Sequence, residues 1–194
     1  PVGGGESTPD YFDRQRRIPD WDQSLVQDQS VLVLGVGGLG CGVALSLCRL
    51  GVRKLYLVDN DVVDAHNLNR QLLFSAADVG DRKVDAAARA LRLTHHLCTE
   101  VVPLHMDALS SWPRIVELVR ECPVVFNAID VGTYFDVAVQ SLALKYNSTL
   151  ISGGTFQHTV TVDFMPAHKP YLRADSAASS APIDETPPPP PPPP

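Results

Sequence analysis

The chain lacks several features that mark specialised classes of protein. It has no run of about 18 apolar residues, so we expect no membrane-spanning helix. Its opening residues, PVGGGESTPD, contain neither a basic nor an apolar segment, so we expect no secretory signal peptide there. A net charge of −6 argues against a general nucleic-acid binder, which is usually basic. We therefore expect neither a nucleic acid nor a membrane among its partners.

Cysteine is scarce, and its spacing does not match that of known metal sites. The chain has four: Cys41, Cys48, Cys98 and Cys122. No two form a C-x-x-C pair, so zinc ribbons and thioredoxin-like sites lack support. Cys41 and Cys48 lie in one helix-like stretch and are expected to share a buried face. Cys98 follows two histidines, which leaves a reactive thiol as an alternative to a quiet cysteine. This usage suits a reducing compartment, and we expect a cytoplasmic protein.

The remaining composition, 44% hydrophobic and 20% charged, is ordinary for an α/β protein with a real core. Strand-like segments occupy 30–37, 54–59, 100–107, 123–130, 149–154 and 159–165, and helix-like segments occupy 38–50, 81–95, 110–122 and 133–146. This alternation predicts βαβ units. Apolar and polar residues alternate in TVTVDFM (159–165), as in a half-exposed antiparallel strand. We therefore predict a Rossmann-like three-layer fold with a largely parallel sheet and an antiparallel C-terminal portion.

A glycine-rich loop, GVGGLG (35–40), follows the first strand and opens a helix. Its glycines, Gly35, Gly37 and Gly38 among them, let the backbone turn tightly and approach a phosphate at the helix N-terminus. Asp59 ends the next strand, where a ribose hydroxyl would be met. A glycine loop alone is weak support, because a turn that binds no ligand has the same pattern.

Polar residues after Asp59 favour ATP over NAD. They are Asp61, Asn67, Asn69, Arg70 and Gln71, followed by Lys83 at a helix start. A dinucleotide enzyme has little need of cations here, whereas a triphosphate whose pyrophosphate leaves gathers charge that they would neutralise. Asp130 ends another strand and can hold Mg²⁺ against phosphate oxygens. Together these residues predict nucleotidyl transfer.

With these residues assembled, the chain resembles the adenylation domain of ubiquitin-activating enzymes and their bacterial ThiF/MoeB-type relatives. The resemblance runs from Tyr11 to Met165 and rests on these pieces: YFDRQ (11–15), GVGGLG, LVDNDVVDAHNLNRQLLF (57–74), VGDRKVDAA (79–87) and NAID (127–130). We expect three parts: an N-terminal arm and helix over 1–29, an ATP-binding adenylation domain over 30–167, and a tail over 168–194 whose small, polar and proline-rich composition predicts disorder. The tail is expected to be a linker, with docking to an SH3-like or WW-like domain as the alternative.

The resemblance also implies roles for individual residues. ATP and Mg²⁺ would serve to adenylate the C-terminal glycine of a ubiquitin-like or sulfur-carrier protein ending in Gly-Gly. Its implied cofactor-binding residues are Gly35, Gly37, Gly38, Asp59, Asp61, Asn67, Arg70, Gln71 and Lys83. Asp130 would bind the metal and, with Arg14 and Arg70, form the catalytic set. Arg14 matches an arginine that family dimers insert into the partner's site, so a homodimer or a heterodimer with a related subunit is expected.

Several departures from the family pattern keep other functions open. Val131 stands where many relatives have an asparagine after the metal-binding aspartate, and no cysteine follows Cys122 to form a thioester. The missing zinc cysteines and the NLNRQLLF segment favour a ubiquitin-like substrate over a sulfur carrier. A non-catalytic partner subunit and an NAD-linked enzyme are the remaining alternatives. The retained residues Asp59, Arg70, Lys83 and Asp130 argue against a non-catalytic subunit.

Overall fold

The computed structural model describes residues 10–94, 99–156 and 159–167, which form three layers around one sheet. The strands are β1 (Ser30–Leu34), β2 (Lys54–Asp59), β3 (Glu100–His105), β4 (Val124–Asn127), β5 (Thr149–Phe156) and β6 (Thr159–Met165). Their order in the sheet is β3-β2-β1-β4-β5-β6. The first five run parallel, and β6 pairs with β5 antiparallel. The predicted Rossmann-like fold with its antiparallel C-terminal portion is therefore confirmed.

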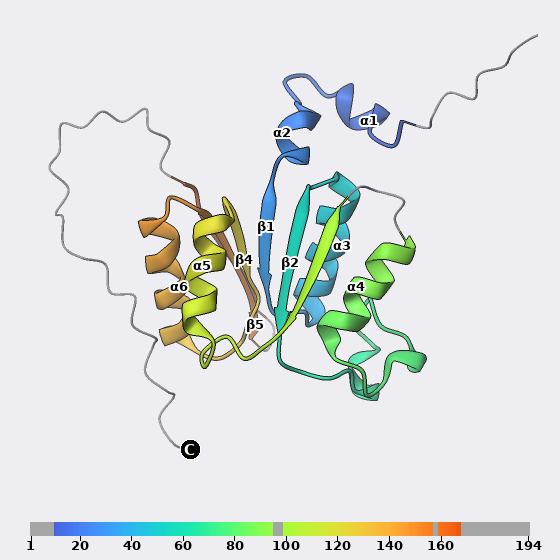
Figure 1. Cartoon of the computed structure of the whole chain (residues 1–194), viewed down its shortest axis with the longest axis vertical. Helices are drawn as coiled ribbons and strands as arrows, with labels where there is room; N and C mark the ends of the chain where they lie inside the picture. Colours follow the sequence, from blue (N-terminus) through green and yellow to red (C-terminus); the bar gives the residue numbers. More distant parts are fainter. Residues whose placement is uncertain (1–9, 95–98, 157–158, 168–194) are drawn as a thin grey trace, which may run out of the picture.

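Helices cover the sheet on both faces (Figure 1). One face carries α3 (Gly38–Leu50) and α4 (Lys83–Thr94), and the other carries α5 (Trp112–Glu121) and α6 (Thr133–Lys145). Strand β1 is fully buried, and alternate residues face the two cores, Val31 and Val33 on one side and Leu32 and Leu34 on the other. Two short 3₁₀ turns, Ala65–Asn67 and Ala76–Asp78, lie between β2 and α4. Burial on both faces explains the uninterrupted apolar run of β1.

The observed strands differ from the predicted ones mainly at their ends, and two positions show the physical reasons at work. The predicted strand over 30–37 ends at Leu34, because Gly35 has a φ of +87° and turns the chain into the glycine loop. Pro103, which weakened the strand prediction over 100–107, is accommodated in β3. Because β3 is an edge strand of the sheet, the missing backbone N–H of Pro103 can face away from β2.

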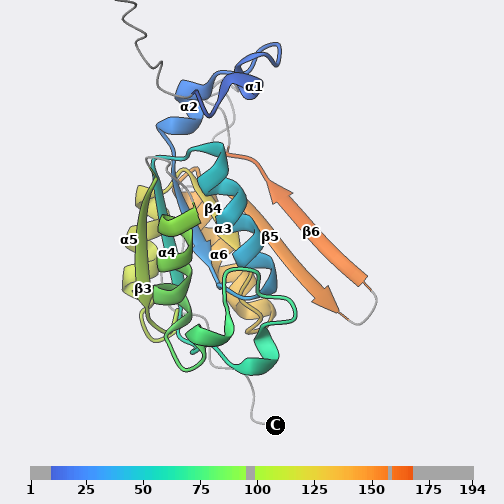
Figure 2. The same cartoon turned by 90° about the vertical axis from the view of Figure 1, so that its right-hand side faces the viewer.

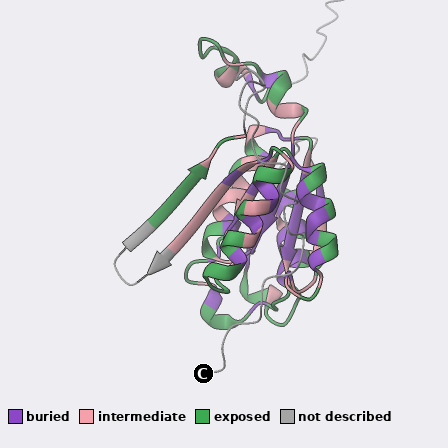
Figure 3. Cartoon of the chain, turned by 90° about the vertical axis from the view of Figure 1, so that its left-hand side faces the viewer, coloured by how far each residue is buried: buried purple, intermediate pink, exposed green. Residues whose placement is uncertain are grey.

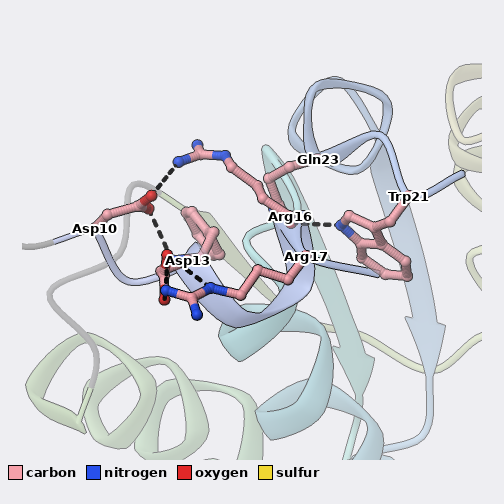
Figure 4. Close-up of polar contacts among 7 residues, drawn as sticks. Asp10, Asp13, Arg16, Arg17, Trp21 and Gln23 are labelled. Carbon is pink, nitrogen blue, oxygen red and sulfur yellow. Dashed lines mark hydrogen bonds and ion pairs between the residues drawn. The ribbon is translucent and has the colours of Figure 1, made fainter. Parts of the chain in front are cut away.

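The N-terminal arm contains two short helices rather than one, α1 (Asp13–Arg16) and α2 (Gln23–Gln27), at the amino end of β1 (Figure 1). Phe12 packs against Gly51, which ends α3 with a φ of +84°, and a Cβ at Gly51 would lie 2.5 Å from the Phe12 ring. Gln23 donates its amide N–H to the carbonyl of Leu50 at 2.8 Å and accepts from the Trp21 indole (Figure 4). The arm is thus docked on the C-terminal end of α3.

The β5–β6 hairpin projects from the helical body, as Figure 2 shows. The side chains of Val162 and Phe164 on β6 are exposed, in contrast to the buried strands at the centre of the sheet (Figure 3). Within the described ranges, no helix has both the length and the apolar character needed to cross a membrane.

The cysteines fall into two groups. Cys41 and Cys48 lie buried on α3, as predicted, and Cys122 is also buried. Burial raises the pKa of each of these three thiols, to about 11 for Cys41 and Cys48 and to about 12 for Cys122. These thiols are therefore protonated and unreactive at neutral pH. Cys98 and the proline-rich tail lie outside the described residues, so the hypotheses about them stay untested.

Candidate nucleotide-binding site

A cleft of about 1220 Å³ opens beside the glycine loop and runs along β5 and β6. The glycine loop contributes Gly37 and Gly38, and the loop after β2 contributes Arg70 and Gln71. The loop after β4 contributes Asp130. Loops at the carboxyl ends of parallel strands, where the strand order reverses, are the usual ligand site in such sheets. Five of the predicted site residues therefore share one cleft.

The glycines of the loop play two different parts. A Cβ at Gly35 would lie 2.7 Å from the carbonyl oxygen of Ala128, and one at Gly40 would lie 1.9 Å from the carbonyl oxygen of Gly35. Both positions therefore require glycine for packing. A Cβ at Gly37, in contrast, would meet no atom within 4 Å. Gly37 therefore leaves space in the cleft next to the first residue of α3. The unpaired backbone N–H groups at this helix N-terminus favour an anion.

Asp59 lies beneath the glycine loop and holds it in place. Its two carboxylate oxygens accept hydrogen bonds from the backbone N–H of Val36 at 2.7 Å and of Asp61 at 2.8 Å. Asp61 in turn forms an ion pair with the Lys83 ammonium at 2.7 Å. Asp59, Asp61 and Lys83 do not line the cleft itself; they form a linked group beside it.

The NLNRQ segment contributes two residues to the cleft and one to the loop itself. Asn67 is buried, and its side-chain oxygen accepts from the backbone N–H of Asp64 at 3.0 Å, which closes the 3₁₀ turn. Arg70 is exposed at the cleft, and its guanidinium donates to the His66 carbonyl at 2.9 Å. Gln71 lines the cleft with only 4% of its surface exposed, and its Oε1 has no hydrogen-bond partner among the described residues. An unsatisfied buried carbonyl of this kind invites a donor from a ligand or water.

Two carboxylates that the sequence did not single out face the same cleft as Asp130. They are Asp136, from the first turn of α6, and Asp163, on β6. Asp136 accepts a hydrogen bond from the buried Asn127 amide at 2.8 Å. Partial burial raises the pKa of Asp136, and the negative charges of Asp130 and Asp163 act in the same direction. The far wall of the cleft is therefore acidic. Asp163 is the one charged residue in TVTVDFM, and this isolated charge is the only feature of the sequence that could have pointed to it.

Arg14 lies away from the cleft, on α1 at the opposite end of α3 (Figure 1). Its neighbours Arg16 and Arg17 pair with Asp10 and Asp13, as Figure 4 shows. The backbone carbonyl of Arg14 accepts from the N–H of Arg17, but its side chain is exposed and forms no hydrogen bond or ion pair with another side chain among the described residues. The thirteen residues of α3 separate the two ends by about 20 Å, beyond the reach of one side chain. Arg14 therefore does not complete the cleft of its own chain.

The fold and the cleft define a doubly wound α/β protein with a candidate ligand site at the strand carboxyl ends. The ThiF family model matches residues 12–191, and the chain belongs to the ThiF family. It is 39% identical over 132 residues to the molybdopterin-synthase adenylyltransferase of Salmonella typhimurium, covering 63% of this chain and 53% of that protein. It is 46% identical over 122 residues to the adenylyltransferase and sulfurtransferase MOCS3 of Bos taurus, covering 61% and 26%. The chain thus spans about half the length of one relative and a quarter of the other.

Among solved structures, the chain is similar to Escherichia coli MccB. The MccB structure with AMPCPP and MccA has a TM-score of 0.67 and 25% sequence identity, covering 76% of this chain and 43% of that one. The MccB structure with ATP has a TM-score of 0.59 and 26% identity, covering 68% and 38%. These matches support the same overall fold and extend the likeness beyond the short motifs.

Proposed function

We propose that this chain binds ATP with Mg²⁺ and adenylates the C-terminal glycine of a ubiquitin-like protein. The observation that carries the proposal is the single cleft that brings Gly37, Gly38, Arg70 and Asp130 together. Such a cleft supplies an open helix N-terminus, a cation and a carboxylate, which are the groups that a magnesium-bound triphosphate needs. The names of the ThiF-family relatives, which are adenylyltransferases, support the same reaction.

In the proposed reaction the substrate's terminal carboxylate attacks the α-phosphorus and pyrophosphate leaves. The chain's residues act by positioning and by neutralising charge, since phosphoryl chemistry needs little covalent help. The N–H groups at the start of α3, with Gly35, Gly37 and Gly38, would hold the phosphates. Arg70 would neutralise the leaving pyrophosphate, together with Lys83. Asp59 would meet the ribose, and Asn67 and Gln71 would complete the nucleotide site, with Asp61 paired to Lys83 beside it.

Asp130 suits Mg²⁺, because hard divalent cations prefer carboxylate oxygens. Within the described residues no group of three or more His, Cys, Asp or Glu side chains could hold a metal ion by itself. Mg²⁺ fits this arrangement, because it commonly uses one or two carboxylates and takes its other ligands from phosphates and water. When bound, it would neutralise the phosphate oxygens and offset the acidic wall formed with Asp136 and Asp163.

Arg14 would act in the site of a second subunit. Its free guanidinium and its distance from the cleft of its own chain support this assignment. A charge delivered from a partner to the developing pyrophosphate is a recurring device in phosphoryl transfer. The active assembly would then be a homodimer or a heterodimer with a related subunit.

A sulfur-carrier protein is the second candidate substrate. The relatives named molybdopterin-synthase adenylyltransferase and adenylyltransferase and sulfurtransferase favour it. Both substrate classes would present a Gly-Gly terminus to the same cleft, so the reaction at the α-phosphorus is common to them.

ATP–pyrophosphate exchange with a panel of ubiquitin-like and sulfur-carrier proteins tests the proposal. We expect Mg²⁺-dependent exchange that requires one panel member and is lost when its terminal glycine is removed. The member that supports exchange decides between the two substrate classes. No exchange with any member, alongside ATP–Mg²⁺ binding, would instead make the chain a partner subunit.

A further inference from the structure

The motif suggests that Asp61 is a nucleotide ligand, but the structure shows its carboxylate paired with Lys83 instead. The Lys83 ammonium lies 2.7 Å from Asp61 Oδ2, and only 8% of the Lys83 side chain is exposed. Asp61 does not line the cleft, and its carboxylate oxygen is directed to the lysine. The structure therefore offers Asp61 a different role.

A buried ammonium at this position needs a counter-charge for two reasons. A buried charge loses its hydration, which is costly unless an opposite charge is paired with it. Lys83 is also the first residue of α4, and the positive end of a helix dipole is unfavourable for a cation. Asp61 is the carboxylate that the structure places against Lys83, and it remains 62% exposed itself. Asp61 thus offsets the cost of burying the positive charge of Lys83.

A continuous set of hydrogen bonds connects this pair to the glycine loop. The backbone N–H of Lys83 donates to the carbonyl of Asp61 at 3.0 Å. The backbone N–H of Asp61 donates to Asp59 Oδ1, and Asp59 Oδ2 accepts from Val36 in the glycine loop. The position of the lysine is thereby fixed relative to the phosphate cradle.

We propose that Asp61 is a positioning residue, which holds the Lys83 ammonium aligned with the glycine loop for the phosphates of ATP. This inference rests on the proposed function. An ammonium has three N–H donors, so Lys83 can keep its bond to Asp61 while it donates to a phosphate oxygen. Asp61 acts on ATP only through Lys83, and removing both residues should cost no more than removing the lysine alone.

A double-mutant cycle on ATP–Mg²⁺ affinity tests this dependence, with the full chain and its Asp61→Asn, Lys83→Gln and doubly substituted variants. We expect each single substitution to weaken binding on the order of tenfold, as loss of one charge partner does. The double variant should bind as weakly as Lys83→Gln, within about twofold. Asp81→Asn is the matched control, because it removes a nearby carboxylate that pairs with Arg89 instead, and it should change affinity by less than about twofold.

Three results would overturn the inference. Additive losses in the double variant would make Asp61 a direct nucleotide ligand. Wild-type affinity in Asp61→Asn would remove any role in binding. Equal losses of ATP–Mg²⁺ affinity in Asp61→Asn and Asp81→Asn would mean that the effect comes from the change in net charge and not from the ion pair with Lys83.

The experiment also separates failure of the inference from failure of the proposed function. If the wild-type chain does not bind ATP–Mg²⁺ at all, the proposed function fails. The same cycle on the free energy of unfolding, without ligand, then reports whether the ion pair is energetically coupled. Uncoupled unfolding energies would overturn the claim that Asp61 stabilises the Lys83 charge.

Discussion

The two ends of helix α3 are built in opposite ways. At its C-terminal end, Gly51 packs under Phe12, and Gln23 satisfies the carbonyl of Leu50. At its N-terminal end, a Cβ at Gly37 would meet nothing within 4 Å, and the first N–H groups face the cleft. We call the C-terminal end of α3 the closed end, because its polar groups are paired and its space is filled. We call the N-terminal end the open end, because neither is true of it. The difference separates residues kept for folding from residues that await a ligand.

The largest effect on activity should come from removing Asp130, the carboxylate in the cleft at the open end of α3. We expect Asp130→Ala to lower ATP–pyrophosphate exchange by about 10³-fold, because the phosphate charge then lacks its metal. Asp130 is exposed, so the free energy of unfolding should change by less than about 0.5 kcal/mol. Exchange assays and urea titrations measure the two quantities, with Asp85→Ala on the exposed face of α4 as control. Normal exchange in Asp130→Ala would remove the metal assignment.

Substitution of Arg14 tests whether this residue, which lies near the closed end of α3, acts in the cleft at the open end of α3 in a second subunit. We expect Arg14→Ala to reduce exchange on the order of 10²-fold, since a cation next to the pyrophosphate is lost. Arg17→Ala, whose side chain pairs with Asp13 at the surface, is the control and should have little effect.

Mixing two inactive variants shows in which subunit Arg14 acts. In a homodimer, a mixture of Arg14→Ala and Asp130→Ala chains forms some sites that have both residues, so part of the activity should return. If the mixture stays inactive although the chains exchange subunits, Arg14 does not act across the interface.

Phe12 probes the closed end directly. Phe12→Ala should lower the free energy of unfolding by roughly 2 kcal/mol, below the range for a phenylalanine deep in a core, because Phe12 lies on a docked arm. Chemical denaturation measures this change, and Tyr11→Ala, whose side chain is 56% exposed, should cost less than about 0.5 kcal/mol. Equal costs at the two positions would mean that the arm is not docked through Phe12.

Gln71 should give the smallest effect. Its buried Oε1 lacks a partner, so Gln71→Leu removes an unsatisfied acceptor and should leave stability unchanged or raise it by about 1 kcal/mol. If the carbonyl meets a donor on the ligand side, ATP affinity should fall by about threefold to tenfold. Calorimetry on the same sample reads both quantities. A marked loss of stability without any loss of affinity would give Gln71 a purely structural role.

The sequence predicted most of the fold because its signals there are local. Strand β2 ends at Asp59 and helix α3 begins at Gly38 as the hydrophobic run and the glycine loop indicate. The site was only partly predictable. Asp136 and Asp163 reach the cleft from α6 and β6, which lie far along the chain from the glycine loop, and no local pattern marks them.

Contacts between distant segments also escaped prediction in the arm and at Asp61. Phe12 and Gly51 are separated along the chain by α1, α2, β1 and α3, so only the folded chain reveals that they pack together. Asp61 was grouped with the nucleotide ligands because of its place in the motif. Its ion pair with Lys83 depends on how the intervening loop folds back, which residue spacing alone does not report.

Thermal stability with ATP–Mg²⁺ and with NAD, in the wild-type chain and in Gly37→Val, tests the central claim most directly. The wild-type chain should gain about 2.7 kcal/mol of stability at a hundred times the Kd of ATP and nothing with NAD. Gly37→Val should fold with an unchanged Tm, because the new side chain has room there, yet show no shift with ATP. A shift with NAD but not ATP, or an undiminished ATP shift in Gly37→Val, would contradict a triphosphate site at the open end of α3.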